Sequence, residues 1–353
     1  MGVKLLLNAV LTLFGVVTIV FFLFHVLGDP AQMMVDQNAS QAQVEKIQAK
    51  YGFDQPLVVQ YLYFLNDLSP LSWYTSKGGV FNSYREDLHG GVALEVGKGN
   101  LVLKWPYLRT SYQRQGKPVA HIIGETLPNT ILLAVASMGI AIIFGLLFGV
   151  ISGYYQASFS DRFLLVTSTL GMSTPSFFSA IIFSWFFGYV LHEWTGLNMT
   201  GSLFVMDDYG EQHQLSLKNL ILPAIVLGIR PLGVIVQLVR SGIIDVMEQE
   251  FIKTAYAKGL SPFQVLHRHA LKNMLNPVIT AVSGWFASLL AGAVFVEYIF
   301  GWRGLGKEMV NALNTLDIPV VTGGVLVIAT LFVAINVTVD YLYTIINPKT
   351  KTI

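Results

Sequence analysis

Three residues near the C-terminal end of the chain have the spacing of a phosphate-binding loop. Gly301, Gly306 and Lys307 fit the pattern G-x4-G-K. The next residue is Glu308, where such a loop needs a Ser or Thr to hold Mg²⁺, and an apolar stretch precedes the motif where a strand is required. We therefore expect no nucleotide to bind here, and read 301–307 as a turn.

No other residues form a catalytic or metal-binding pattern. His267 and His269 are two apart, so on a helix they point to different faces and cannot easily share a metal ion. The chain has no Cys, which excludes disulfides, thiolate zinc sites and a cysteine nucleophile. It also lacks the HExxH and GxSxG patterns. We expect a protein that is not an enzyme and holds no metal.

Arg230, Glu297 and Asp340 are ionisable residues within or at the ends of apolar stretches, and the first two are candidates for transport chemistry. Arg230 is near the middle of one stretch and Glu297 near the end of another. A charge in the middle of a membrane span costs about 2.5–3.5 kcal/mol on insertion scales, so it should face protein or water. One hypothesis is that both line a substrate path, where Arg230 meets an anionic group. The alternative is a structural ion pair between them.

Composition places these residues in a membrane protein. The chain has 353 residues, of which 53% are hydrophobic and only 12% charged. Soluble domains have about 25% charged residues. The net charge of +1 indicates no particular partner, and the composition does not favour disorder or nucleic-acid binding.

The apolar residues are grouped in runs long enough to cross a bilayer, which takes about 20 residues in a helix. The first run is too long for a cleaved signal peptide and lacks a small-residue cleavage site, so it is expected to be an uncleaved anchor. The predicted fold is an all-α polytopic membrane protein with six transmembrane helices, at 5–27, 130–154, 163–191, 220–239, 278–300 and 321–346.

Basic residues predict the orientation of these spans. Lys and Arg are enriched in short cytoplasmic loops. With both termini inside, the short inner segments carry nine such residues and the short outer loops carry three. We expect both termini in the cytoplasm and the long segment 28–127 outside.

The segment 28–127 is expected to form a small external domain. Residues 40–50 have helical spacing with Gly52 as a stop, and Pro56 opens a second short helix over 57–65. Residues 69–107 are rich in glycine, with alternating apolar residues around 101–103, which indicates loops and a hairpin.

Small residues and prolines within the spans predict how the helices pack. Gly145, Gly149 and Gly153 recur every four residues, which lets helix backbones approach closely. We expect them to pack within the bundle, with a subunit interface as the alternative. Pro175 and Pro231 lie inside spans and should kink them.

The most informative segment is the inner loop 242–276. Apolar residues at 251, 252, 255 and 256 have helical spacing, and Gly259 follows where a left-handed residue ends a helix. Ser261, Pro262 and Gln264 then fit an N-cap, a first helical position and a capping box. The result is a helix–glycine–helix loop, too long for a passive connector. It either docks a partner or lies on the lipid surface as an amphipathic element.

This loop resembles a family motif. TAYAKGLSPFQVLHRHALKNML at 254–275 is similar to the coupling motif of binding-protein-dependent ABC transporter permeases, in the branch for peptides and nickel. Similar signatures run along almost the whole chain: GDPAQ at 28–32, YGFDQPLVVQYLYFL at 51–65, ETLPNTILL at 125–133, STPSFF at 173–178, VEYIFGWRGLGKEMVNAL at 296–313 and DIPVVTGGVLVIATLFVAINVTVDYLYTIINPK at 317–349. Residues 69–107 have no counterpart in that pattern and resemble an insertion.

The resemblance implies a division into an anchor span (1–27), an external domain (28–127) and a five-span permease core (128–347) with its cytoplasmic coupling loop (242–276). It implies an importer of short peptides in the prokaryotic inner membrane, with nickel or another small solute as the alternative. The implied partners are separate ATPases that hold ATP and Mg²⁺, a second permease subunit or a second copy of this chain, and an extracytoplasmic substrate-binding protein. No nucleic acid and no cofactor of its own are expected.

The resemblance also assigns roles to residues. Those implied to couple to the ATPase are Thr254, Ala255, Ala257, Gly259, Leu260 and Ser261, and those implied at an external gate or binding-protein contact are Gly301, Trp302, Gly304 and Gly306. An ion-driven secondary transporter is the rival hypothesis, but it predicts acidic residues deep in several spans, and these are missing.

Overall fold

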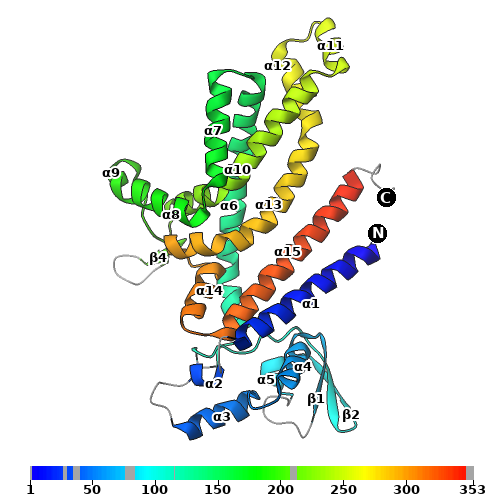
Figure 1. The fold of residues 1–353 in the computed structure, drawn as a ribbon, viewed down its shortest axis with the longest axis vertical. Coiled ribbons are helices and arrows are strands. Elements are labelled where there is room, and N and C mark those ends of the chain that lie inside the picture. The colour runs from blue at the N-terminus through cyan, green and yellow to red at the C-terminus, as the bar shows by residue number, and fades with distance from the viewer. Residues whose placement is uncertain are drawn as a thin grey trace. The chain divides into compact units, whose positions relative to one another are not determined.

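The structure is a computed structural model that describes residues 2–26, 30–34, 40–75, 84–114, 116–206 and 213–346. Part of the expected insertion (76–83), the start of the 28–32 signature and the basic C-terminal segment 347–353 lie outside the described residues. Helices dominate the fold (Figure 1). The longest are α1 (Gly2–Val26), α6 (Val119–Tyr154), α10 (Lys218–Met247), α13 (Leu271–Phe300) and α15 (Ile318–Ile346).

Most of the predicted spans correspond to long apolar helices. Four helical stretches are long and apolar enough to cross a membrane, and a bent helix pair can form a fifth span. The first predicted span corresponds to α1, which carries a shorter apolar stretch, Leu7–Leu23. The all-α polytopic class is confirmed, and six spans remain compatible with these helices. The four stretches are Val119–Tyr154, Lys218–Met247, Pro277–Phe300 and Ile318–Val339.

The predicted third span is not one continuous helix. It consists of α7 (Phe159–Ser173) and α8 (Ser176–Trp185), followed by a π-helical turn (Phe186–Val190), with a bend of 110° between the two halves. Thr174 is extended (ψ 131°) because the ring of Pro175 excludes the helical conformation from the residue before it. The expected kink at Pro175 is therefore a full break, whereas α10 continues through Pro231.

The glycines at 145, 149 and 153 bring α6 against α10. A Cβ built on Gly149 would lie 2.5 Å from the Cβ of Val239, and one on Gly145 would lie 2.7 Å from a methyl group of Ile235. No side chain fits at such distances, so the two helices can approach this closely only with glycine. This confirms the expectation of packing within the bundle.

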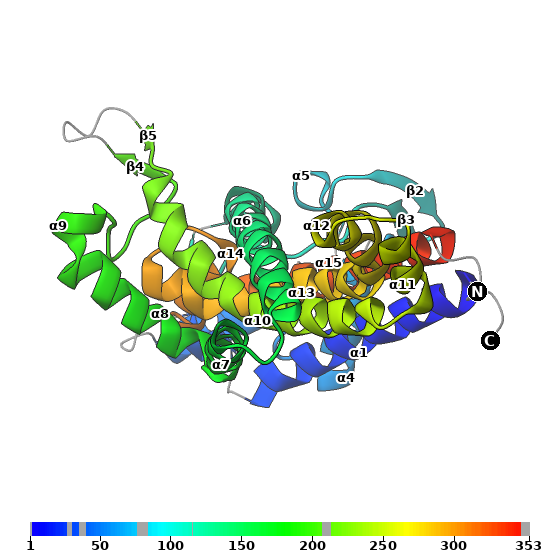
Figure 2. The same cartoon turned by 90° about the horizontal axis from the view of Figure 1, so that it is seen from above.

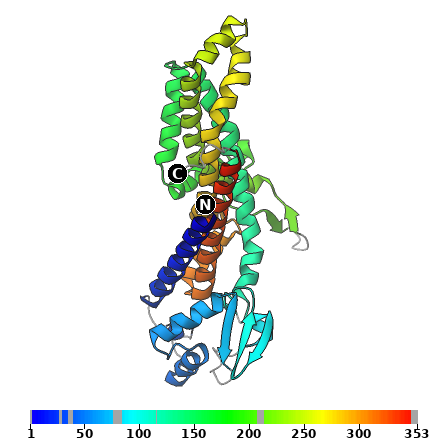
Figure 3. The same ribbon diagram turned by 90° about the vertical axis from the view of Figure 1, so that its right-hand side faces the viewer.

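The segment between α1 and α6 contains short helices and a small sheet. The helices α3 (Gln41–Tyr51) and α4 (Leu57–Leu68) confirm the two predicted ones, and Gly52 ends α3 with φ +72°. The hairpin expected near 101–103 is present and belongs to a sheet of order β1-β3-β2, seen side by side in Figure 3. The remaining elements are α2 (Pro30–Met33), β1 (Leu71–Thr75), α5 (Glu86–His89), β2 (Val92–Val96) and β3 (Gly99–Leu103).

The chain forms two compact units. One contains Met1–Thr126 and Glu308–Ala329, and the other contains Leu127–Lys307 and Thr330–Ile353. The second unit includes most of the apolar helices and a β4–β5 hairpin that projects beside the start of α10 (Figure 2). Its shorter elements are α9 (His192–Thr195), β4 (Phe204–Met206), β5 (His213–Leu215), α11 (Glu250–Ala257), α12 (Pro262–Val265) and a π-helical turn (Leu266–Ala270). The helix α14 (Leu305–Asn314) begins in this unit and ends in the first.

Candidate functional site

The loop between α10 and α13 has the predicted helix–glycine–helix form and stands at one end of these two helices (Figure 1). Gly259 adopts φ +80° just after α11. Its N–H donates to the Tyr256 carbonyl at 2.9 Å, and the Leu260 N–H donates to the Ala255 carbonyl at 3.3 Å. These two bonds are those of a Schellman motif, so the backbone turns sharply without losing its hydrogen bonds.

The second helix of the loop begins with the predicted capping box. The Ser261 hydroxyl accepts from the Gln264 N–H at 3.4 Å, and the Gln264 side-chain oxygen accepts from the Ser261 N–H at 3.0 Å. Pro262 occupies the first helical position, where its missing N–H costs nothing. This helix continues beyond the loop. It passes through the π-helical turn 266–270 directly into α13, so the loop is a rigid extension of that helix.

A small core holds the two loop helices together. Ile252, Ala255 and Val265 are buried against one another, with Leu260 partly buried beside them. Much of the remaining loop surface faces outward, including Phe263, whose side chain is 74% exposed. The loop thus combines a fixed shape with an accessible surface, which includes Thr254, Ala257, Gly259 and Ser261.

A buried carboxylate fixes the α6–α7 turn to α10, close to this loop. Asp161, at the start of α7, forms a salt bridge with Arg240 of α10, with distances of 2.7 and 2.9 Å to Nε and Nη2. The same carboxylate accepts hydrogen bonds from the Ser152 hydroxyl and from the Ala157 N–H at 2.8 Å. Its side chain is only 2% exposed. Arg240 follows the predicted span 220–239 directly and lies within α10, which continues to Met247.

A second buried carboxylate organises the 301–307 turn. Glu297 is fully buried, and its carboxylate accepts a hydrogen bond from the Lys307 N–H at 3.1 Å. Gly304 and Gly306 both lie against it: a Cβ on Gly304 would lie 2.4 Å from the carboxyl carbon. Trp302 is also buried and donates its indole N–H to the Asn129 carbonyl at 3.0 Å. Gly301 ends α13 in the left-handed conformation, φ +69°.

The ion pair considered for Arg230 and Glu297 is not formed. Arg230 is exposed on α10, and no salt bridge of Arg230 with a carboxylate is found among the described residues. Glu297 is instead enclosed by the 301–307 turn and by backbone donors. This alternative was therefore wrong, because the turn, which sequence spacing cannot place, folds back over the carboxylate.

Replacing Gly306 with alanine should destabilise this turn. A Cβ at position 306 would lie 2.5 Å from the Cα of Val294, a backbone atom that cannot move aside. Overpacking of this kind costs about 1–3 kcal/mol. We expect a lower apparent melting temperature of the detergent-purified chain. Gly284→Ala in α13 is the matched control, because a Cβ there meets nothing within 4 Å. Equal melting temperatures for the two variants would show that the close approach is absent.

Long apolar helices and a capped loop that continues into one of them define a polytopic membrane protein. The profile of the family described as "Binding-protein-dependent transport system inner membrane component" matches residues 145–352, and the profile of its N-terminal component matches residues 2–79. The chain belongs to this family, which consists of transport permeases and not of enzymes. The resemblance seen in the coupling motif is confirmed.

Named relatives match the chain over almost its whole length. It is 32% identical to the dipeptide transport system permease protein DppB of Alkalihalophilus pseudofirmus, over 99% of this chain and 98% of the relative. It is 33% identical to the di/tripeptide transport system permease protein DppB of Pseudomonas aeruginosa, over 96% and 95%. A solved inward-facing structure of the MetNI methionine ABC transporter shares the fold, with a TM-score of 0.50 at 15% identity, covering 64% of this chain and 97% of that one.

Proposed function

We propose that this chain is the permease subunit of an ATP-driven importer of short peptides in the cytoplasmic membrane. The observation that carries the proposal is the match, over almost the whole chain, to relatives named as dipeptide and di/tripeptide permeases. These names favour peptides over nickel or another small solute. The family membership likewise favours ATP-driven transport over an ion-coupled secondary transporter.

The α11–α12 loop is the proposed contact with the ATPase. Thr254, Ala257, Gly259 and Ser261 present backbone and small side chains at its surface, so a partner can approach closely. Ala255 and Leu260 belong to the small core under this surface and hold the two helices together. Because the loop is continuous with α13 and close to the end of α10, a push on it moves both helices. This is the mechanical link that an ATP-driven permease needs.

The remaining parts of the transporter follow from the family. A second permease subunit, or a second copy of this chain, completes the translocation path, and two cytoplasmic ATPases hold ATP and Mg²⁺. An extracytoplasmic binding protein delivers the peptide, and the 301–306 turn, which is largely buried, is the proposed external gate. Both termini and the α11–α12 loop are on the cytoplasmic side. Arg230, exposed on α10, lines the path and meets the carboxylate of the peptide.

The test is uptake by the complete transporter in proteoliposomes. The complex that co-purifies with the tagged chain is reconstituted with ATP inside and the binding protein outside, and labelled Ala-Phe and ⁶³Ni²⁺ are offered separately. We expect ATP-dependent uptake of the peptide and none of nickel. Arg230→Gln should lower peptide uptake, and unchanged uptake would remove Arg230 from the path. Nickel uptake alone, or a chain that purifies without an ATPase after crosslinking, would contradict the proposal.

A further inference from the structure

The first compact unit contains two adjoining cavities, lined by the segment between α1 and α6 and, for the smaller cavity, also by α1 and the start of α15. The larger has a volume of about 400 Å³ and the smaller about 70 Å³. Both are lined in part by Tyr51, Arg109 and Tyr112, so these three side chains form their common boundary. The larger volume is within the range of small-molecule sites. Neither cavity contains a residue that the transport mechanism above uses.

The larger cavity is lined by more positive than negative charge. Among the described residues that line it, Lys50, Arg85 and Arg109 are cationic and Asp67 is the one carboxylate. Arg109 pairs with Asp67 at 2.9 Å, and no described carboxylate forms a salt bridge with Lys50, so the charge of Lys50 is additional to that pair. The buried ammonium of Lys104 lies close by and donates to the main-chain carbonyl of Asp67. An anion is therefore the ligand that this charge distribution favours.

The other titratable groups of the larger cavity are uncharged at neutral pH. Burial raises the pKa of Tyr107 and of Tyr112 to about 12, so both keep their hydroxyl protons. Burial also lowers the pKa of His89, whose ring packs against Tyr107 at 4.6 Å between centroids. None of these groups adds a negative charge that would repel an anion.

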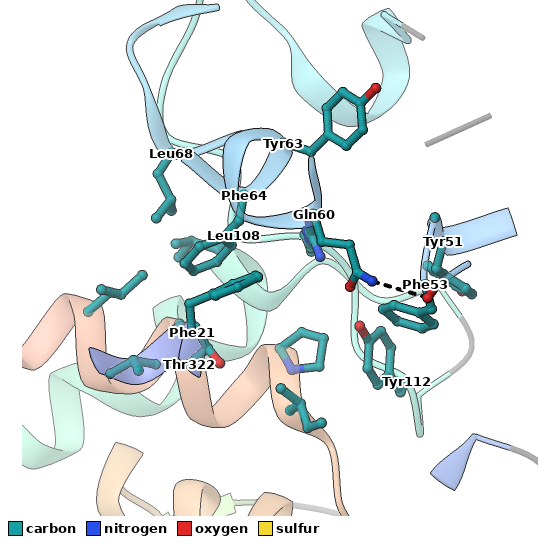
Figure 4. A pocket seen from close by; sticks show the side chains of 17 residues that line it. Phe21, Tyr51, Phe53, Gln60, Tyr63, Phe64, Leu68, Leu108, Tyr112 and Thr322 are labelled. Atoms are coloured by element: carbon teal, nitrogen blue, oxygen red, sulfur yellow. Dashed lines mark hydrogen bonds between the residues drawn. The ribbon is translucent and has the colours of Figure 1, made fainter. Parts of the chain in front are cut away.

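The smaller cavity is mostly aromatic and apolar. Figure 4 shows Phe21 and Phe64 on one side of it, stacked with ring centroids 5.4 Å apart. On the other side Tyr51, Phe53 and Tyr112 form a cluster with centroids 5.6–6.2 Å apart. A volume of about 70 Å³ holds roughly five to seven water-sized positions. That suits a single apolar side chain and is too little for the acyl chain of a lipid.

Arg109 is held in place at the boundary of the two cavities. Its backbone has φ +64°, which non-glycine residues adopt only where their surroundings hold them. Its carbonyl accepts from the Val119 N–H at 3.0 Å, its Nε bonds Asp67, and its guanidinium lies 5.7 Å from the Phe64 ring centroid. The guanidinium is thus oriented before any ligand arrives, which lowers the cost of binding.

We propose that the two cavities form one binding site for a small solute with a carboxylate and a neighbouring apolar side chain, such as the C-terminal residue of a short peptide. The carboxylate occupies the cationic cavity near Lys50, Arg85 and Arg109, and the side chain occupies the aromatic one. The charge and shape of the site favour this chemistry by themselves. The choice of a peptide as its source rests on the proposed function.

The first test compares ligands on the natural chain. The full-length chain in phosphatidylcholine nanodiscs, without ATPase or binding protein, is titrated with Ala-Phe, Ala-Phe-amide and Ala-Gly by equilibrium dialysis. A hydrogen bond to a charged group is strong enough that its loss weakens binding about tenfold or more. We expect Ala-Phe to bind at least tenfold more tightly than its amide, and also more tightly than Ala-Gly. Equal binding of Ala-Phe and its amide would overturn the proposal.

The second test uses matched variants of α3 and α5. Lys50→Gln and Arg85→Gln remove cations that line the site, and each should weaken Ala-Phe binding about tenfold. Lys46→Gln is the control, because Lys46 is exposed one turn earlier on the same helix and does not line either cavity. Equal affinities for Lys46→Gln and both site variants would contradict the proposal. If a site variant misfolds, the ligand comparison above still tests the proposal, because it uses only the natural chain.

The outcomes separate this site from transport and from lipid binding. If the complete transporter takes up Ala-Phe while the chain alone binds no peptide, the site is absent although the proposed function stands. If Ala-Phe binds the chain as predicted while the complete transporter takes up no peptide, the site stands although the proposed function fails. Displacement of bound Ala-Phe by phosphatidylglycerol in the nanodisc, but not by added acetate, would assign the cavities to a lipid and overturn the proposal.

Discussion

Gly259→Val in the assembled transporter should reduce ATP-driven peptide uptake more than tenfold while the membrane helices stay folded. Gly259 has φ +80°, where a residue with a Cβ costs roughly 1–2 kcal/mol and a β-branched residue more. A Cβ there would meet nothing within 4 Å, so the substitution causes no clash in the bundle. The cost is confined to the turn, which opens and separates α11 from α12. The ATPase contact then loses its shape.

Two measurements check this prediction. Uptake of labelled Ala-Phe reports coupling, and co-purification of the ATPase with the tagged chain reports docking. Gly259→Asn is the matched variant, because asparagine tolerates the left-handed conformation far better than valine, so it should keep most of the ATPase contact. An apparent melting temperature equal to that of the natural chain shows that the helices remain folded. Normal uptake by Gly259→Val would show that the shape of the turn does not matter.

The form of this loop could be predicted because its determinants are local. Gly259 and the Ser261–Gln264 box act within a few residues of the backbone they shape, and the structure has them as the sequence indicates. The same holds for Gly52 at the end of α3. Side chains that satisfy nearby N–H and carbonyl groups leave a readable pattern, whatever the rest of the fold does.

The third predicted span shows what hydropathy cannot reveal. Residues 163–191 are apolar throughout, but hydropathy records no direction, so a straight helix and a pair bent by 110° look alike. Pro175 indicates a kink, but the size of the bend depends on what α8 packs against. Neighbours of α8 from distant parts of the sequence, α10 and α13, decide this.

The buried ion pair and the two cavities were missed because they join distant residues. Asp161 and Arg240 are 79 positions apart, and the boundary of the cavities combines Tyr51 with Arg109 and Tyr112. One local sign was available. Ser158 and Asp161 have the spacing of a capping box, and the Ser158 hydroxyl accepts from the Asp161 N–H. That spacing predicts the start of α7, but it does not indicate that the carboxylate is also the partner of Arg240.

Asp161→Ala should destabilise the bundle, because this carboxylate is an acceptor shared by three donors. The substitution leaves Arg240, the Ser152 hydroxyl and the Ala157 N–H without their shared acceptor. Breaking a buried pair costs about 3–5 kcal/mol. Arg240 keeps 25% of its side chain exposed and can reach some water, so we expect about 2–3 kcal/mol here. The measurement is the apparent melting temperature in detergent, with Asp245→Ala, an exposed acid on α10, as control.

A double-mutant cycle distinguishes a specific pair from a general need for charge. Asp161→Ala leaves the Arg240 guanidinium without its carboxylate partner, whereas Asp161→Ala combined with Arg240→Leu removes both charges. The double variant should therefore lose less stability than the sum of the losses of the two single variants. The pair also joins the α6–α7 turn to the helix that leads into the α11–α12 loop. Peptide uptake by the double variant should therefore fall further than its melting temperature alone predicts. Additive losses of stability, with uptake in proportion, would mean that Asp161 and Arg240 act independently.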